Sequence, residues 1–546
     1  GTTDANVYFA SEFLPNNLQE NWDKGIAGYY VGVTDVLTNG DWKYATLTDG
    51  GVSIVKYTGT ETSLDLTSLD LGGEIKQIGG FAFYRSGVTQ ITLPETVNTI
   101  QRYAFAYSNL TSVTLPKNVR FVGQYAFYHT AVTSVDIPED SSLTKIEQYA
   151  FAQNDSLTSI TLPASLEEIG TYAFYGSALT TLNFADGFGM TKIAEYAFAD
   201  TDLTSVTIPD SVNYIDNSAF RDCLNLQTVN FGSAQDLQLH ANAFYNTGLT
   251  LVNIPANLRY VGEYALIGLQ NLQAYTVDEN NPYYKSVDGV LYTKDGKKLI
   301  AFPAGRTGSF VVPAFVETIG FGAFENTKLN SVSFEDGINL LTLGYRAFYN
   351  AQNLTEVAIP ASMVSIDYYA FAECRSLQKV TFAEENKLTG IYEGAFLNCI
   401  NLSDITIPDS IVEISDFAFY GCTAITKLPI SENSAIKGIY DYAFAYTGIT
   451  DLVVPDTVIE IGAYAFRGTP VKKVYISDAQ MNTLEIGIGA LQDCDVLEDL
   501  RIPFTGNAYG GQYVWFGYIF GAGNACANAT YMPNSLKKLF IKTSSP

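Results

Sequence analysis

Seven charged residues of alternating sign occupy equivalent positions of a segment that recurs through the second half of the 546-residue chain. They are Glu356, Lys379, Asp404, Lys427, Asp451, Lys473 and Asp499. If these segments stack as parallel strands, neighbouring members lie about 5 Å apart, where opposite charges attract by roughly 0.2–1 kcal/mol per pair. The series predicts either an ion-pair ladder that sets the stacking register or a charged surface for a ligand.

A second recurring position is polar in most copies of the segment. In the first half of the chain it holds Thr114, Asp136, Thr161 and Asn183. Side chains of this kind can hydrogen-bond a ligand when they point out of a sheet, but they also form ladders between neighbouring strands. These four residues are candidate binding residues, with a structural ladder as the alternative.

Catalytic chemistry has little support in the sequence. The two histidines, His129 and His240, lie in different copies of the segment, and neither has an evident partner. The sequence contains no G-x-S-x-G, H-E-x-x-H or phosphate-binding-loop motif. The acidic stretch around Asp278 lacks the spacing of a calcium loop. We expect no catalytic residues, no metal site and no cofactor.

Five of the six cysteines fall at one position, three residues after a recurring Phe or Leu. They are Cys223, Cys374, Cys399, Cys422 and Cys494. Other copies place Ser, Thr, Asn or Ala there, which indicates a small buried slot that a thiol can fill. No C-x-x-C spacing supports a zinc site. We expect these thiols to be free; Cys526 lies outside the pattern.

A repeat of mostly 22 to 25 residues must position all of these side chains. One copy reads "NLTSVTLPKNVRFVGQYAF" from Asn109, and an Ala-Phe or Ala-Leu pair marks 17 copies between Phe83 and Leu491. Alternating apolar residues predict a short strand, which a proline often ends. A period of 20–29 residues with an L-x-x-L-x-L core is typical of a leucine-rich repeat. One copy cannot bury its apolar face alone, so the copies must stack.

The repeat predicts a leucine-rich-repeat solenoid that is rich in β-structure and poor in helix. We expect one long parallel sheet on one face, with the recurring Phe filling the interior of each coil. Aromatic residues two positions before that Phe, such as Tyr103 and Tyr125, are expected to pack between coils.

Five regions are predicted. One gap between copies is 58 residues long, and Asp295-Gly296 inside it suits a two-residue hairpin turn. The regions are an N-terminal cap (1–60), a first block of repeats (61–276), a β-hairpin insertion (277–310), a second block of repeats (311–503) and a C-terminal cap (504–546).

The phrase "LTSVTIPDSV" followed by the Ala-Phe pair resembles the repeat of BspA-like surface proteins, also called Treponema pallidum-type leucine-rich repeats. The resemblance covers roughly residues 41–503, and the insertion is similar to one that recurs in this family. It implies a secreted or surface protein of a bacterium. Some members are linked to binding host matrix proteins and to cell–cell aggregation, and the family has no shared catalytic residues.

Composition narrows the class of partner. With 31 basic and 57 acidic residues, the net charge is 31 − 57 = −26, which disfavours nucleic acid and anionic membranes. The sequence contains no window of 18 apolar residues, so it predicts no membrane-spanning helix. We expect a monomeric, non-catalytic protein, extracellular or at the cell surface, that binds an extracellular protein or glycan in adhesion. The alternatives are a structural spacer that displays another domain and a carbohydrate-binding module.

Overall fold

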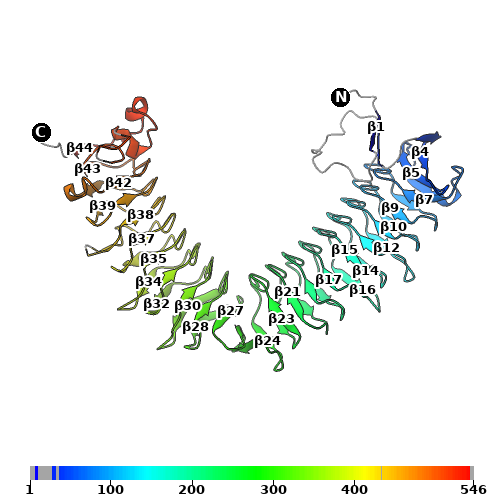
Figure 1. The fold of residues 1–546 in the computed structure, drawn as a ribbon, viewed down its shortest axis with the longest axis horizontal. Helices are drawn as coiled ribbons and strands as arrows, with labels where there is room; N and C mark the ends of the chain where they lie inside the picture. The colour runs from blue at the N-terminus through cyan, green and yellow to red at the C-terminus, as the bar shows by residue number, and fades with distance from the viewer. Residues whose placement is uncertain are drawn as a thin grey trace. The chain divides into compact units, whose positions relative to one another are not determined.

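The computed structural model describes residues 6–9, 28–31, 36–431, 433–508, 510–513 and 515–541. Contacts divide the chain into two units, Gly1–Leu269 with Asp278–Pro282, and Gln270–Val277 with Tyr283–Pro546. Each unit is a stack of short β-coils (Figure 1). The leucine-rich-repeat solenoid predicted from the sequence is therefore confirmed.

The first row of strands is the predicted one, formed where the apolar alternation of each repeat lies. In the first unit it comprises β6 (Ser63–Asp65), β8 (Gln90–Thr92), β10 (Ser112–Thr114), β12 (Ser134–Asp136), β14 (Ser159–Leu162), β16 (Thr181–Phe184), β18 (Ser205–Thr207), β20 (Thr228–Asn230) and β22 (Leu251–Ile254). In the second unit it comprises β24 (Ala274–Val277), β28 (Thr307–Val312), β30 (Lys328–Phe334), β32 (Glu356–Ile359), β34 (Lys379–Phe382), β36 (Asp404–Ile405), β39 (Asp451–Val454), β41 (Lys473–Ile476), β43 (Asp499–Ile502) and β44 (Lys538–Ile541). The strands pair in parallel, but in several shorter sheets rather than one continuous sheet.

A second row of parallel strands, which the sequence analysis did not predict, runs through the second apolar stretch of each repeat. In the first unit it comprises β7 (Ile75–Ile78), β9 (Thr99–Ile100), β11 (Phe121–Val122), β13 (Lys145–Ile146), β15 (Glu168–Ile169), β17 (Lys192–Ile193), β19 (Tyr214–Ile215), β21 (Leu237–Leu239) and β23 (Leu258–Val261). In the second unit it comprises β27 (Lys298–Ala301), β29 (Thr318–Ile319), β31 (Thr342–Leu343), β33 (Ser365–Ile366), β35 (Gly390–Ile391), β37 (Glu413–Ile414), β38 (Gly438–Ile439), β40 (Glu460–Ile461) and β42 (Glu485–Ile486). Most of these strands are only two residues long, too short for alternation to reveal them.

The recurring Phe residues fill the coil interiors, as predicted. In the second unit they form a continuous stack from Phe302 to Phe466, with neighbouring ring centroids 4.7–5.8 Å apart. The rings from Phe83 to Phe244 stack in the same way in the first unit, at 5.0–5.6 Å. Each ring is almost fully buried, so the stack is the core that joins one coil to the next.

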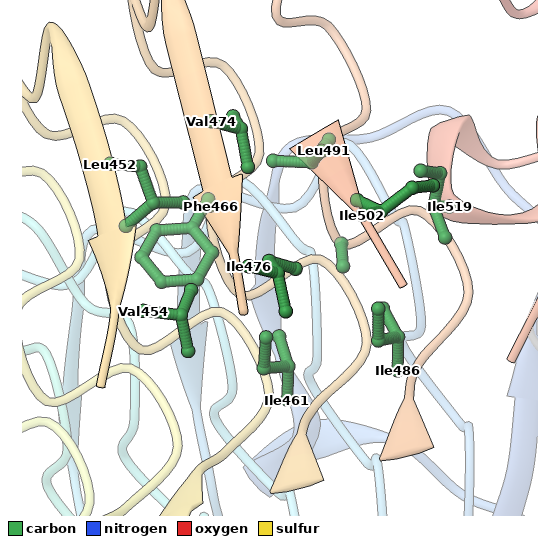
Figure 2. Close-up of a pocket in the computed structure, with 11 residues that line it drawn as sticks. Leu452, Val454, Ile461, Phe466, Val474, Ile476, Ile486, Leu491, Ile502 and Ile519 are labelled. Carbon is green, nitrogen blue, oxygen red and sulfur yellow. The ribbon is translucent and has the colours of Figure 1, made fainter. Parts of the chain in front are cut away.

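The stack ends where Leu491 replaces Phe, and a small void lies there (Figure 2). Its volume is about 10 Å³, and its lining is apolar, including Phe466, Ile486 and Ile519. A void of this size without polar partners does not hold ordered water. It is a packing gap left by the smaller side chain and not a ligand site.

A third hydrogen-bonded row joins the coils through the segment around each Phe. The N–H groups of Tyr103, Phe105 and Tyr107 donate to carbonyls of the next coil at 3.0, 2.8 and 2.9 Å. The residues two before and two after the Phe both have positive φ, 56° at Tyr103 and 58° at Tyr107. Most other coils repeat this left-handed pair, which is rare for residues other than glycine.

The long gap between repeats contains a coil that the sequence analysis missed. Ala301 and Phe302 form another copy of the Ala-Phe pair, and the Phe302 ring stacks on Phe324 at 5.1 Å. The predicted hairpin is present as β26 (Val290–Thr293) paired antiparallel with β27, and β25 (Tyr284–Val287) pairs on the other side of β26. The insertion is therefore a three-stranded meander whose last strand is also the second-row strand of the missed coil.

Both predicted caps contain strands that join the solenoid sheets. At the N-terminal side, β3 (Leu37–Asn39), β4 (Trp42–Thr46) and β5 (Val52–Tyr57) form an antiparallel meander, and β5 pairs in parallel with β7. The part of the predicted 1–60 cap before residue 36 lies outside the described residues, except for β1 (Asn6–Phe9) and β2 (Gly28–Val31), which pair in parallel. At the C-terminal side, β44 returns to pair with β43. The exact boundaries of the five regions stay predictions.

Helix is scarce, as expected for this repeat. The helices of the described residues are short 3-10 segments, and none has the length and apolarity needed to cross a membrane. They are η1 (Leu66–Ser68), η2 (Asp478–Gln480), η3 (Phe516–Phe520) and η4 (Ala525–Thr530).

Candidate functional site

The alternating charges stand opposite one another in the first-row sheets of the second unit. Parallel register pairs Glu356 with Lys379 and Lys379 with Asp404. Lys427 is bridged to Asp451, and Asp451, Lys473 and Asp499 follow in register. All seven side chains are exposed except Asp499, which is half-buried. The structure thus brings these residues into one outward column in each sheet.

Only part of this column forms close ion pairs. Lys379 Nζ lies 2.8 Å from the Asp404 carboxylate, and this hydrogen bond raises the pKa of Lys379 above its usual value. Lys538 of the C-terminal region, which the sequence analysis did not include, extends the column and lies 4.0 Å from Asp499. Exposed pairs of this kind contribute about 0–1 kcal/mol. The strands hold these residues in register, but charges such as Lys473 stay outside close ion pairs among the described residues.

A groove of about 330 Å³ lies on the outward face of β39, β41, β43 and β44. Its floor is a second column, in which Val453, Tyr475, Arg501 and Phe540 stand opposite one another in register. Val453, Tyr475 and Phe540 are 61%, 40% and 56% exposed, which is high for apolar and aromatic side chains. Asp451, Lys473 and Asp499 line the same groove.

Arg501 links the apolar and charged parts of the groove. Its guanidinium carbon lies 5.1 Å from the centre of the Tyr475 ring, and one terminal nitrogen lies 3.7 Å from the Asp478 carboxylate. A guanidinium over an aromatic face is held by a cation–π attraction of about 0.5–1 kcal/mol at an exposed site. The groove therefore presents an aromatic ring and a guanidinium group next to each other.

The four candidate polar residues of the first unit are all exposed, as their strands predict, and Asn183 lines a hollow. This hollow of about 580 Å³ lies where β16 and β18 belong to different sheets. Its lining is rich in oxygen, with Thr207 and Asp210 beside Asn183. Thr114 and Asp136 stand in register with their neighbours in the β10–β12 ladder, and Thr161 pairs with Asn183.

The aromatic column before each Phe packs between coils, which confirms that prediction. The rings of Phe81, Tyr103, Tyr125, Tyr149, Tyr172 and Tyr196 stack face to face at 4.5–4.9 Å. Desolvation raises the pKa of Tyr103, Tyr125 and Tyr149 above the usual tyrosine value. The faces of these rings are covered by the neighbouring rings, so they offer little stacking surface to a ligand.

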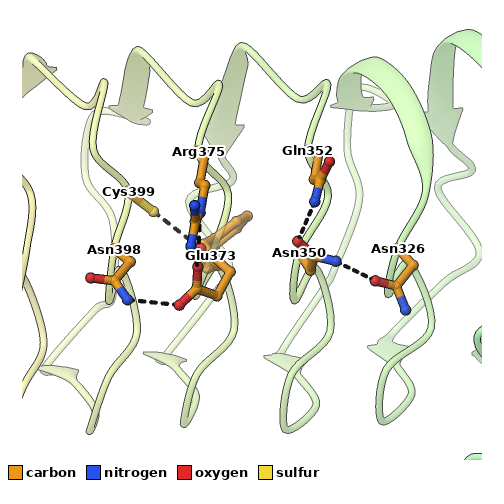
Figure 3. A network of polar contacts seen from close by, with 8 residues as sticks. Asn326, Asn350, Gln352, Glu373, Arg375, Asn398 and Cys399 are labelled. Atoms are coloured by element: carbon orange, nitrogen blue, oxygen red, sulfur yellow. Dashed lines mark hydrogen bonds and ion pairs between the residues drawn. The ribbon is translucent and has the colours of Figure 1, made fainter.

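A polar network on the second left-handed position connects coils of the second unit (Figure 3). Asn350 donates to Asn326 at 2.5 Å, and Asn398 donates to Glu373 at 2.7 Å. Glu373 also accepts from Arg375 at 2.9 Å. Because every member bonds to another coil or to its own turn, we assign this network to stacking of the coils.

The cysteine slot is buried and its thiols are free, as predicted. The thiols of Cys374, Cys399 and Cys422 donate to the carbonyls of Phe348, Phe371 and Phe396 in the preceding coils, at 3.0–3.1 Å. In other coils a Ser or Thr in this slot donates to the Phe carbonyl of its own coil, as Ser177 does to Phe174 at 2.8 Å. In these coils the slot residue satisfies a backbone carbonyl, whereas the buried hydroxyls of Ser86, Ser108 and Thr327 in the same slot have no hydrogen-bond partner among the described residues.

We expect a thiol reagent to modify one cysteine per native molecule, and six after unfolding. Burial raises the pKa of Cys374 to about 12, which suppresses its thiolate at neutral pH, whereas Cys526 is exposed. The measurement is an absorbance titration with an aromatic disulfide at pH 8, with and without denaturant. Rapid modification of two or more thiols in the native protein would contradict the buried slot.

Sequence reasoning missed the floor of the groove, although its signal was present. Val453, Tyr475 and Arg501 occupy the same position of the repeat as Thr114 and its equivalents, between two inward apolar residues. A change from hydroxyl and amide side chains to apolar, aromatic and basic ones marks the part of the column that forms the floor of the groove.

Comparison with known proteins supports the fold. A family model described as the BspA type leucine rich repeat region (6 copies) matches residues 76–190, 191–287, 301–426 and 385–498. No curated protein matches the chain.

Several solved structures are similar. A leucine rich cell surface protein from Faecalibacterium prausnitzii has 26% identity and a TM-score of 0.50, covering 73% of this chain and 95% of that one. The pneumococcal vaccine antigen PcpA has 17% identity and a TM-score of 0.47, covering 93% and 99%. The T. pallidum leucine rich repeat protein has 21% identity and a TM-score of 0.23, covering 41% and 80%. Because the family model matches more than half of its residues, the chain belongs to the BspA-type leucine-rich-repeat family.

Proposed function

We propose that this chain is a non-catalytic binding protein of a bacterial surface or secreted layer, which adheres to an extracellular protein through its first-row face. The observation that carries the proposal is the groove on β39, β41, β43 and β44, where Tyr475, Arg501 and Phe540 are exposed side by side. The other coils supply the scaffold that holds these side chains in register.

The composition of the groove suits a protein partner. Tyr and Arg are the residues most often found at the energetic centre of protein interfaces, and aromatic residues are enriched there. Tyr475 and Arg501 already contact each other, so little side-chain freedom is lost when a partner binds. The surrounding Asp451, Lys473 and Asp499 carry charges of both signs, which favour one orientation of the partner.

One similar protein supports a location at the cell surface. The Faecalibacterium prausnitzii protein, which is 26% identical, is described as a cell surface protein. The net charge of −26 argues against nucleic acid as the partner.

The proposal predicts that a double variant, Tyr475→Ala with Arg501→Ala, weakens binding at least tenfold. Each truncation of an interface centre costs about 2 kcal/mol or more, and 1.4 kcal/mol corresponds to tenfold. The measurement is a surface-binding titration of the purified chain on immobilised matrix proteins, mucins and glycans, with and without calcium.

The matched control is Thr381→Ala, at the same position of the repeat in β34, because Ala358 occupies that position in β32. It is expected to bind like the unchanged chain. Absence of saturable binding across the array, or equal binding by the double variant with unchanged thermal stability, would overturn the proposal.

A glycan is the second candidate ligand. Tyr475 and Phe540 present exposed rings, and the hollow beside Asn183 combines hydroxyl, amide and carboxylate groups with the ring of Phe184. Sugars are bound by such a mixture of hydrogen-bonding groups and aromatic faces. Saturable binding to glycans alone in the same array would favour this candidate over a protein partner.

A further inference from the structure

β44 is one of the two outer strands of its sheet; at the other end, an isolated bridge joins Lys427 to Asp451 of β39. The strand order is β39-β41-β43-β44, so β44 has a neighbour on one side only among the described residues. The edge of a strand presents backbone N–H and C=O groups that can pair with another extended segment.

The inward side of β44 is also incompletely covered. Leu452, Val474, Leu500 and Leu539 form one inward column in register. The first three are at most 3% exposed, whereas Leu539 is 41% exposed. Much of the apolar surface of Leu539 is therefore left uncovered.

Two charged residues stand at the start of each of β41, β43 and β44. Their sign changes from one strand to the next, from basic to acidic and back to basic. β41 is entered by Lys472-Lys473, β43 by Glu498-Asp499 and β44 by Lys537-Lys538. Lys537 lies 2.9 Å from Glu498 and Lys538 lies 4.0 Å from Asp499, and the hydrogen bond from Lys537 holds the pKa of Glu498 below its usual value. The one acidic pair, Glu498-Asp499, thus lies between two basic pairs on its neighbouring strands.

The three strands read "KKVYI", "EDLRI" and "KKLFI". Lys537 and Lys538 at the start of β44 have the same charges as Lys472 and Lys473 at the start of β41. On the β41 side, that basic pair already stands next to the acidic pair Glu498 and Asp499. By the same complementarity, the open side of β44 fits a strand of the "EDLRI" kind and repels one of the "KKLFI" kind.

We propose that the open edge of β44 binds an extended protein segment in which two acidic residues precede an apolar–x–apolar stretch. The segment adds to the sheet as a parallel strand. Its backbone pairs with β44, its carboxylates face Lys537 and Lys538, and its first apolar side chain covers Leu539. This edge is a contact separate from the groove, so it does not depend on the function proposed above.

Lysines on an edge strand also have a purely protective use, since they discourage other strands from pairing there. That use predicts weak binding of every strand. The proposal predicts selection by charge, and this difference can be measured.

The test uses the whole chain and two labelled peptides, "EDLRIPFTG", which is the sequence of residues 498–506, and its charge-reversed form "KKLRIPFTG". Fluorescence anisotropy is expected to show at least tenfold tighter binding of the acidic peptide at low salt. The preference is expected to shrink as salt is raised.

Reversing the edge charges with Lys537→Glu and Lys538→Glu is expected to invert this preference. Neutralising the two lysines with Lys537→Gln and Lys538→Gln is expected to abolish the preference for the acidic peptide. This milder variant keeps the test valid if the charge-reversed variant misfolds. The matched control is Lys117→Glu with Lys387→Glu, two exposed lysines outside this sheet that make the same change in net charge. Equal binding of both peptides, no binding of either, or an unchanged preference in the reversed variant would overturn the proposal.

Discussion

Replacing Phe396 with alanine is expected to lower the free energy of unfolding of the second unit by about 3–5 kcal/mol. The ring is fully buried and stacks on Phe371 at 5.4 Å and on Phe419 at 5.3 Å. Truncation leaves a cavity in the centre of a stack that neighbouring coils cannot close without breaking their own hydrogen bonds. Urea unfolding followed by far-UV circular dichroism measures the loss.

Phe396→Leu and Val364→Ala are the matched controls. Leucine already occupies this position at Leu266 and Leu491, so the leucine variant is expected to lose less than half as much as the alanine variant. Val364 is 45% exposed, and its truncation is expected to change stability by less than about 0.5 kcal/mol. A loss below about 1 kcal/mol for Phe396→Ala would show that the stack is not the core of the solenoid.

Replacing Tyr125 with valine is expected to destabilise the first unit by about 3 kcal/mol. Two costs add in this variant. Tyr125 has a φ of 57°, a left-handed conformation that costs a side chain about 1–2 kcal/mol and is worst for a β-branched one. Its ring also stacks on Tyr103 at 4.7 Å and on Tyr149 at 4.8 Å, and each such contact stabilises by about 0.5–1.5 kcal/mol.

Other coils of the chain supply variants that separate these costs. Phe81 and Phe417 hold the same position, so Tyr125→Phe keeps both ring contacts and is expected to be nearly neutral. Asn242 holds it with a φ of 58°, so Tyr125→Asn keeps the backbone and loses only the stacking, about 2 kcal/mol. Thermal and urea unfolding of the three variants should give the order Phe, Asn, Val. Equal losses for Asn and Val would mean that β-branching carries no extra cost at this left-handed position.

The repeat made the stacked coils, the first row of strands and the buried Phe predictable. These features depend on the type and spacing of apolar residues, as in the segment from Asn109 to Phe127, and such residues have few other ways to be buried. The alternating charges from Glu356 to Asp499 were predicted for the same reason, because stacking at a fixed period places equivalent side chains opposite one another.

Backbone geometry was much harder to predict. Tyr and Phe at the left-handed position before the core Phe are stabilised by stacking across coils, a tertiary effect that overrides local preference. The second row of strands pairs residues 20 to 25 positions apart in segments of mostly two residues, so no local alternation marks it.

The missed coil and the missed groove have simpler causes. Ala301-Phe302 follows a hairpin that breaks the repeat period, so the pair is displaced from the expected spacing. Tyr475 and Arg501 lie in the column that is polar in most other copies. Phe540 stands opposite Arg501 only because β44 returns to the sheet from 35 residues beyond Pro503.

The central claim is that the outward face of β39, β41, β43 and β44 contacts the partner. Hydrogen-exchange footprinting of the whole chain, free and saturated with a protein that the array captures, tests it most directly. We expect slower exchange in peptides that cover Asp451–Val454, Lys473–Ile476 and Asp499–Ile502, with second-row strands such as Glu413–Ile414 and Glu460–Ile461 unchanged. Protection confined to the second row, with the first-row strands unchanged, would contradict it.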